Sequence, residues 1–354
     1  MSKDKIQAEI LKSIEPYNRC TIAVSMGVGK TRVGLKWLEG KGKALVVIPI
    51  HSVKDTWNKE KKAINSNVEL EFVTYRSLYK KNPNDYSAIV LDECHNLLNK
   101  HRVFLSFFGG QILGTTGTPP VKKNSEKYLM VEQYCPVKYT YSVDSATDDK
   151  ILNDYIIYIH NLKLSNEKNL PKKRKDGKIW YSSETIDYNW HTSSLDKAIS
   201  NKDRQWKSIM RMKSMMTYKT KEKYAKKLLK KINSKCIVFA NTQEQADKLC
   251  SHSYHSNNNM SQQNLEMFSD GRINQLSCVL QLNEGVNIPG LKQGIILHAY
   301  GNNRKSAQRI GRLLRLNPDE TSICHILCYE NTIDKKWVKD ALSEFDETKI
   351  RFVN

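Results

Sequence analysis

A glycine-rich stretch from Val24 to Thr31, Val-Ser-Met-Gly-Val-Gly-Lys-Thr, constrains this chain more than any other feature. An apolar run precedes it and apolar residues at helical spacing follow, so its glycines fall at a turn from a strand to a helix. Such a turn lets backbone N–H groups converge on an anion at the helix N-terminus. The pattern predicts a phosphate-binding loop. The alternative is a chance glycine turn before an amphipathic helix.

The side chains of this loop match the chemistry of a nucleoside triphosphate. Lys30 is expected to reach the β- and γ-phosphates, and the Thr31 hydroxyl is expected to hold Mg²⁺. The first glycine of the full pattern is absent, because Val24 stands there. The residues that we expect to bind the nucleotide in this loop are Gly27, Val28, Gly29, Lys30 and Thr31.

A strand-like apolar run from Ala88 to Glu93 ends on two carboxylates. The carboxyl ends of parallel strands form one edge of a sheet, and the glycine loop lies at the same edge. Asp92 and Glu93 are therefore expected to face the triphosphate. We expect Asp92 to hold Mg²⁺ and Glu93 to orient and deprotonate the attacking water. The alternative for such an acidic pair is a helix N-cap.

Strands alternate with helices up to about residue 120, which predicts a doubly wound parallel α/β domain. A second α/β block starts near Lys219, and 354 residues suit two domains. We expect a first domain at 1–140, a linker or insertion at 141–218 and a second domain at 219–354. In the second domain, a predicted helix from Arg304 to Leu316 carries no acid. Its Gln308, Arg312 and Arg315 share one face, which suits the charge of a γ-phosphate.

The middle segment is basic and aromatic. Residues 161–180 hold seven Lys or Arg against two acids, and Lys-Asp-Gly-Lys at 175–178 predicts a hairpin. Aromatic side chains could stack on bases while lysines follow phosphates. The alternative is an exposed loop that tryptophans anchor to the first domain. A single helix is predicted from Leu195 to Tyr218, with its methionines in the core. The candidate nucleic-acid contacts here are Lys172, Lys173, Arg174, Lys175 and Trp180.

The net charge of +20 favours a polyanionic partner, because clustered Lys and Arg release counterions from phosphate backbones. A lysine-rich solvated surface is the plainer interpretation. No run of about 18 apolar residues occurs, so no membrane span is expected. The eight cysteines are scattered without a CxxC pair, which predicts reduced core residues of a cytosolic protein and no structural zinc.

Taken together, these blocks resemble the superfamily 2 helicases and translocases. VSMGVGKT resembles motif I of that family, VVIPIHSVKDTWNKE motif Ia, and Asp92-Glu93-Cys94-His95 a DECH form of motif II. TTGTPP resembles motif III, IVFANTQEQADKL motif IV, LNEGVNIPG motif V and QRIGRLLR motif VI. The match covers about two thirds of the chain in the family's order. It implies two RecA-like domains with ATP at their interface.

The resemblance also implies roles for single residues. Gln7 stands where the family reads adenine, Arg312 and Arg315 look like arginine fingers, and Gln308 looks like a γ-phosphate sensor. Asn287 replaces the Asp that motif V often places near the ribose. The family's motifs Ia, IV and V line the nucleic-acid groove, which makes candidates of Ser52, Thr74, Asn241, Thr242 and Asn283.

The function implied is an ATP-dependent helicase or translocase that acts on DNA, either single-stranded, forked or branched, as a monomer in the cytoplasm. The composition, rich in Lys, Asn and Ile, hints at an AT-rich genome such as that of a phage. An RNA helicase is the alternative among enzymes. A non-catalytic nucleic-acid-binding scaffold with a decayed ATPase is the alternative from another class. A single-domain nucleotide kinase does not fit the second domain.

Overall fold

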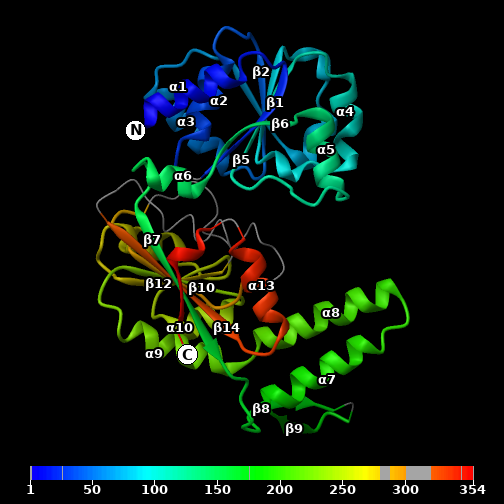
Figure 1. The fold of residues 1–354 in the computed structure, drawn as a ribbon, viewed down its shortest axis with the longest axis vertical. Coiled ribbons are helices and arrows are strands. Elements are labelled where there is room, and N and C mark those ends of the chain that lie inside the picture. Colours follow the sequence, from blue (N-terminus) through cyan, green and yellow to red (C-terminus); the bar gives the residue numbers. More distant parts are fainter. Residues whose placement is uncertain are drawn as a thin grey trace. The chain divides into compact units, whose positions relative to one another are not determined.

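The structure is a computed structural model that describes residues 2–25, 27–174, 176–279, 288–299, 320–343 and 345–353. These residues form two compact units, and the chain passes from one to the other between Asp154 and Tyr155. Each unit is an α/β sheet with helices (Figure 1). The doubly wound α/β class predicted from the sequence is confirmed.

The first unit is built on a six-stranded sheet in the order β3-β2-β4-β5-β1-β6, in which every neighbouring pair is parallel. Its strands are β1 (Arg19–Val24), β2 (Ala44–Ile48), β3 (Leu70–Thr74), β4 (Ala88–Asp92), β5 (Gln111–Thr116) and β6 (Val137–Tyr141). All residues of β2 and β4 are buried, as expected for central parallel strands that are covered on both faces.

Helices cover both faces of this sheet. Figure 1 shows α1, α2 and α3 on one face and α4 and α5 on the other. The helices are α1 (Lys3–Ile14), α2 (Lys30–Leu38), α3 (Val53–Ala63), α4 (Arg102–Phe107), α5 (Glu126–Tyr134) and α6 (Val143–Asp148). Four short 3₁₀ turns complete the unit: η1 (Tyr75–Lys80), η2 (Pro83–Asp85), η3 (Cys94–Asn96) and η4 (Asn99–His101). The apolar core between β4, β5, α4 and α5 includes Leu91, Ile112 and Met130.

The second unit has a seven-stranded sheet in the order β11-β12-β10-β13-β14-β7-β15. Its strands are β7 (Asp154–Leu162), β10 (Cys236–Ala240), β11 (Ser253–Tyr254), β12 (Gln275–Val279), β13 (Gln293–Ile296), β14 (Thr321–Tyr329) and β15 (Ile350–Val353). Its helices are α9 (Lys219–Leu229), α10 (Gln243–Leu249), α11 (Ser261–Ser269) and α13 (Ile333–Ala341), with the turn η5 (Glu347–Lys349). β7 lies within the segment 141–218, yet it belongs to this sheet.

A smaller module precedes α9. It consists of an antiparallel hairpin, β8 (Leu170–Lys173) and β9 (Ile179–Ser182), and two helices, α7 (Glu184–Asp196) and α8 (Asn201–Met216). The hairpin predicted at 175–178 is confirmed, and Gly177 takes a left-handed conformation in its turn with φ of 84°. We call these four elements the basic module.

The prediction of one helix from Leu195 to Tyr218 is wrong. The helical conformation is interrupted at residues 197–200. Ser200 then caps the second helix by accepting a hydrogen bond from the backbone N–H of Asp203. Ile199 lies in this break and is 94% exposed. Of the methionines in α8, Met215 is buried and Met210 only half-buried, so the core side of the helix is narrower than the sequence predicted.

Candidate active site and nucleic-acid interface

The glycine loop joins β1 to α2 in the geometry that the sequence predicts. Gly27 and Gly29 have φ of 95° and 98°, in the left-handed region that favours glycine, and α2 begins at Lys30. The Lys30 ammonium donates to the carbonyl oxygen of Val24 at 3.2 Å, so it lies inside the loop. The backbone N–H groups of the first turn of α2 have no acceptor within the helix, and together with this ammonium they can form a cradle for an anion.

Gln7 supports the loop from α1. Its side chain is fully buried, and Nε2 donates to the carbonyl oxygen of Val28 at 2.8 Å. A Cβ atom at Gly29 would lie 2.6 Å from the same Nε2, so the close packing of α1 requires glycine there. Gln7 Oε1 is buried without a hydrogen-bond partner among the described residues. A buried acceptor beside the loop fits the adenine-reading role expected of Gln7, because an exocyclic amine would satisfy it.

Asp92 ends β4 at the carboxyl edge of the sheet, where the loop also lies. Both of its carboxylate oxygens accept hydrogen bonds: Oδ1 from Thr115 Oγ1 at 3.0 Å and Oδ2 from the indole Nε1 of Trp57 at 3.1 Å. Burial, and then the charge of Glu93, raise the pKa of Asp92. A buried carboxylate with two donors and one cationic neighbour, Lys30, is suited to receive a divalent cation.

Glu93 follows in a left-handed conformation with φ of 52°, which is rare for a residue other than glycine. Its Oε2 accepts from Thr116 Oγ1 at 3.1 Å and lies 3.2 Å from His95 Nδ1. Burial favours a higher pKa, but the His95 hydrogen bond and the charge of Lys30 outweigh it and lower the pKa of Glu93 to about 2. Glu93 is therefore anionic at neutral pH. It can accept a hydrogen bond from the attacking water and so orient it.

The threonines of the 115–118 turn hold both carboxylates. In the parallel register, Asp92 is aligned with Thr115 of β5, and Ala23 of β1 is aligned with Thr116. From the sequence, TTGTPP was only a resemblance to motif III, and no role was predicted for its threonines or for Trp57. The signal that could have found them is the register of the parallel strands, which places the ends of β4 and β5 side by side.

Several predicted site residues lie outside the described residues. They are Lys175, Asn283, Asn287, Gln308, Arg312 and Arg315.

The predicted nucleic-acid contacts of the first unit differ in exposure. Ser52 is exposed just before α3, and its hydroxyl makes no capping hydrogen bond there. Thr74, at the end of β3, is buried.

In the second unit, the predicted contacts lie after β10, which lies between β12 and β13 in the sheet. Thr242 Oγ1 is engaged as the N-cap of α10, accepting from the backbone N–H of Gln245. Asn241 is buried, and its amide atoms have no hydrogen-bond partner among the described residues.

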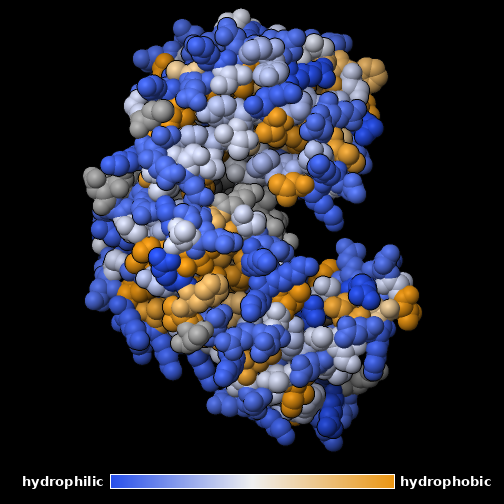
Figure 2. All heavy atoms as spheres, in the orientation of Figure 1, coloured by the Kyte–Doolittle hydropathy of each residue, from blue (hydrophilic) through white to orange (hydrophobic). Residues whose placement is uncertain are grey.

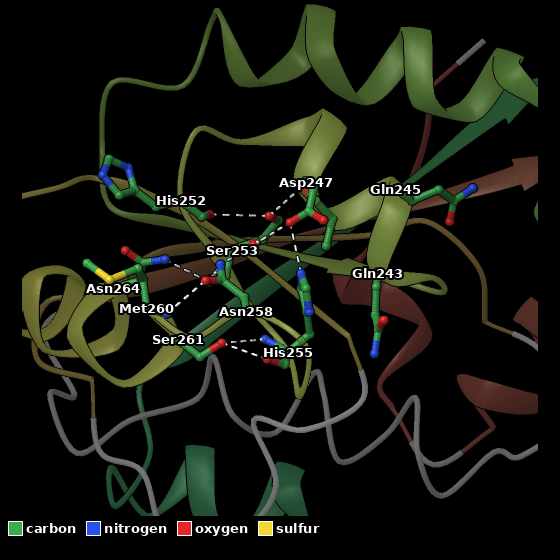
Figure 3. Close-up of polar contacts among 12 residues, drawn as sticks. Gln243, Gln245, Asp247, His252, Ser253, His255, Asn258, Met260, Ser261 and Asn264 are labelled. Carbon is green, nitrogen blue, oxygen red and sulfur yellow. Dashed lines mark hydrogen bonds and ion pairs between the residues drawn. The ribbon is translucent and has the colours of Figure 1, made fainter.

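A polar cluster fixes the chain that follows these two residues (Figure 3). His255 Nε2 lies 2.8 Å from Asp247 Oδ1, which also accepts from Ser253 Oγ at 2.6 Å. Asn258 and Asn264 both donate to the Ser253 carbonyl oxygen. The cluster therefore ties α10, β11 and α11 together.

The basic module exposes three tryptophans: Trp180 is 41% exposed, Trp190 64% and Trp206 60%. Figure 2 shows apolar side chains at the surface of this module among hydrophilic ones. Lys173 and Arg174 are exposed, whereas Lys172 is engaged, because its ammonium lies 2.5 Å from Asp187 Oδ1 of α7. Lys172 therefore fastens the hairpin to the helices, and its neighbours remain accessible.

Two parallel α/β units, the first with a phosphate-binding loop and two carboxylates at its carboxyl edge, define a P-loop protein of RecA-like architecture. Residues 219–317 match the family described as the helicase conserved C-terminal domain. The chain is 25% identical over 370 residues to the DNA 3'-5' translocase XPB2 of Sulfurisphaera tokodaii, covering 92% of this chain and 82% of that protein.

Solved structures share the fold. The DNA-bound ATP-dependent type ISP restriction-modification enzyme LlaBIII is similar with a TM-score of 0.63 at 15% identity, covering 99% of this chain and 31% of that enzyme. The helicase domain of Hef from Pyrococcus furiosus is similar with a TM-score of 0.52 at 15% identity, covering 94% and 96% of the two chains. The helicase domain match and the translocase relative agree with the resemblance to superfamily 2 helicases and translocases, and the solved structures share the fold.

Within the described part of the chain, each helix is too short or too polar to cross a lipid bilayer.

Proposed function

We propose that this chain is an ATP-driven motor that moves along DNA and separates or remodels it. The observation that carries the proposal is the cluster of Lys30, Asp92 and Glu93. The positive charge of Lys30 favours the anionic form of both carboxylates, and each carboxylate accepts a hydrogen bond from a threonine. The relative whose name describes a DNA 3'-5' translocase supports DNA as the track. A decayed ATPase would have no reason to retain this arrangement, which argues against a non-catalytic scaffold.

The residues present fit ATP and Mg²⁺. The left-handed glycines at 27 and 29 leave a cradle of backbone N–H groups, and Lys30 stands ready to bind the β- and γ-phosphates. Thr31 and Asp92 would hold Mg²⁺, which neutralises phosphate charge when bound. Glu93 would orient the attacking water by accepting its hydrogen bond, with Thr116 and His95 fixing the direction of the carboxylate.

The second unit is proposed to complete the ATP site. Arg312 and Arg315 would stabilise charge on the γ-phosphate, Gln308 would sense that phosphate, and Asn287 would lie near the ribose. A loop that binds ATP without these arginines would hydrolyse it poorly, because guanidinium groups supply the transition-state charge stabilisation. Closing and opening of the two domains during each cycle would drive the steps.

The proposed DNA contacts form two groups. Ser52, Thr74, Asn241, Thr242 and Asn283 would line the groove that the family's motifs Ia, IV and V form. Lys173, Arg174, Lys175 and Trp180 of the hairpin would contact phosphates and bases, with Lys172 holding the hairpin in place. Exposed aromatic side chains beside cations suit unstacked bases, which favours forked, branched or single-stranded DNA. A monomer and a cytoplasmic location stay predictions.

The test is ATP hydrolysis measured with single-stranded DNA, duplex DNA, branched DNA and RNA as separate stimulants. We expect at least one DNA to raise kcat well above the rate without nucleic acid, and RNA to stimulate less. Stimulation by RNA alone would make the chain an RNA helicase. Hydrolysis that no nucleic acid changes would contradict a motor of either kind.

A further inference from the structure

Trp57 joins three elements of the first unit. It stands in α3 and is fully buried, and its indole N–H donates to Asp92 Oδ2 at the end of β4. The far edge of the same ring lies against α2, because a Cβ atom at Gly34 would approach its Cη2 to 2.7 Å. One side chain therefore fixes the spacing between α3, the helix that begins with Lys30, and the carboxylate of Asp92.

Two donors from different elements define the orientation of this carboxylate. Thr115 holds Oδ1 from β5, and Trp57 holds Oδ2 from α3. The peptide carbonyl of Asp92 is also fixed, since it accepts from the Tyr75 hydroxyl at 2.9 Å. Hydrogen bonds to a charged acceptor are stronger than those between neutral groups, so loss of one donor frees the carboxylate to rotate. Trp57 is the donor that moves with α3.

A second contact ties α3 to α2. Glu60, one turn after Trp57, accepts from Arg32 Nε at 2.5 Å, and Arg32 follows Thr31 directly in the sequence. The opposite end of α3 is at the surface: Ile50 is 41% exposed, and Ser52 is exposed. The helix thus runs from a surface segment, five residues before Trp57, to the residues that surround the nucleotide loop.

We propose that Trp57 is a positioning residue that couples nucleic acid bound at the start of α3 to the orientation of Asp92. The inference rests on the proposed function, in which Ser52 contacts DNA and Asp92 holds Mg²⁺. A small rotation of α3 on binding would carry the indole ring with it and change the N–H···Oδ2 contact. The ring cannot reorient on its own to keep that contact, because it is packed closely against Gly34. Thr115, on the sheet, would hold the other oxygen in place.

The sharpest variant replaces only the donor. β-(3-Benzothienyl)alanine at position 57 keeps the shape of the indole and substitutes sulfur for the N–H, and W57F is the simpler companion. The control is W37F, which alters a buried tryptophan of α2 whose ring contacts Lys41. Thermal unfolding of each variant shows whether the fold is intact. The isosteric variant decides the outcome if W57F fails to fold.

Two readouts separate positioning from packing. The first is the dependence of ATP hydrolysis on Mg²⁺ concentration, with and without the best stimulating DNA. We expect loss of the donor to lower DNA-stimulated kcat and raise the half-saturating Mg²⁺ concentration, each about tenfold, with KM for ATP nearly unchanged. The second is the indole N–H signal of Trp57 in the protein without nucleotide. We expect D92N and added DNA each to shift that signal more than the Trp37 signal.

The proposal is overturned if the isosteric variant matches W37F in kcat and Mg²⁺ dependence, or if DNA that stimulates the wild type leaves the Trp57 signal in place. Failure of the proposed function looks different. In that case no nucleic acid stimulates the wild-type protein, so DNA binding is not coupled to Asp92. The Mg²⁺ dependence of the basal rate still decides whether Trp57 positions Asp92.

Discussion

Thr116 donates a hydrogen bond to Glu93, with 3.1 Å between its Oγ1 and the Oε2 of the carboxylate. The same hydroxyl oxygen lies 2.9 Å from His95 Nδ1 and accepts from the backbone N–H of Thr118 at 3.1 Å. These contacts fix the orientation of the Glu93 carboxylate. The orientation of the proposed water-binding group thus depends on a side chain 23 residues away in the sequence.

Replacing Thr116 with valine tests this dependence. T116V keeps the shape and removes the donor, so we expect kcat for ATP hydrolysis to fall by about 10- to 100-fold, because a hydrogen bond to a charged group is worth about 1.5–3 kcal/mol. KM for ATP should change little. T118V is the matched control, since Thr118 is buried and its hydroxyl has no hydrogen-bond partner among the described residues. Equal rates for the two variants would remove Thr116 from the role.

A buried ion pair holds the second unit together. Lys221 of α9 bonds Asp334 of α13, and both side chains are completely buried. K221M leaves the Asp334 charge unpaired, so the free energy of unfolding should fall by about 3–5 kcal/mol. K226M removes a half-exposed pair with Glu222 on the same helix and should cost less than about 1 kcal/mol. Urea denaturation measures both. If K221M and K226M lost similar amounts of unfolding free energy, the buried ion pair between Lys221 and Asp334 would not stabilise the unit as predicted.

The second unit should lose stability in mild acid. His160 Nε2 and His325 Nδ1 are 2.9 Å apart, and burial, followed by the charge of His160, lowers the pKa of His325 to about 4. Since the folded pKa is below the ordinary value of about 6.5, the unfolded chain takes up the proton first. The contribution of neutral His325 to the free energy of unfolding is complete above pH 6.5. It is lost as the pH falls to about 4, and the loss amounts to roughly 3 kcal/mol. Burial also lowers the pKa of His160, so its contribution has the same sign.

The variant H325Q isolates this effect. Its unfolding free energy, measured by urea denaturation from pH 8 to pH 4, should decline less steeply than that of the wild type below about pH 6.5. Carboxylates titrate in the same range in both proteins, so only the difference between the two curves reports on His325. Parallel curves would contradict the prediction.

Neighbouring cations of the basic module should differ in their effect on DNA binding. Lys173 and Arg174 are exposed, so K173A/R174A should weaken DNA binding and lower the slope of log affinity against log salt by roughly 1.5–2. K122A/K123A removes the same charge from an exposed loop of the first unit and controls for net charge. K172A should instead loosen β8 from α7, because Lys172 pairs with Asp187. An unchanged slope in K173A/R174A would make the hairpin a plain surface loop.

Local patterns predicted the elements that position the site. The glycine loop, β4 and its two carboxylates follow from short apolar runs and turn residues that lie next to each other in the sequence. The cysteines expected in the core are all buried. Thr242 precedes α10 and caps it, as threonine commonly does at a helix N-terminus.

Contacts between distant residues could not be predicted in this way. Trp57 and Asp92 are 35 residues apart, and an indole in an amphipathic helix reads as an apolar core residue until its N–H finds a carboxylate. Lys221 lies among other lysines in the sequence, and only the packing of α13 shows that it is buried with Asp334. The break between α7 and α8 was missed because the apolar spacing runs through it, although Ser200 marks a new N-cap.

The central claim is that ATP hydrolysis moves this chain along DNA, and displacement of a third strand tests it most directly. A fluorescent triplex-forming strand is placed on a duplex, and its release is followed with ATP for the wild type and E93Q. We predict release by the wild type, and release by E93Q at least about 100-fold slower although it still binds ATP and DNA. Equal release by both proteins, or no release by a wild type whose ATP hydrolysis DNA stimulates, would contradict the claim.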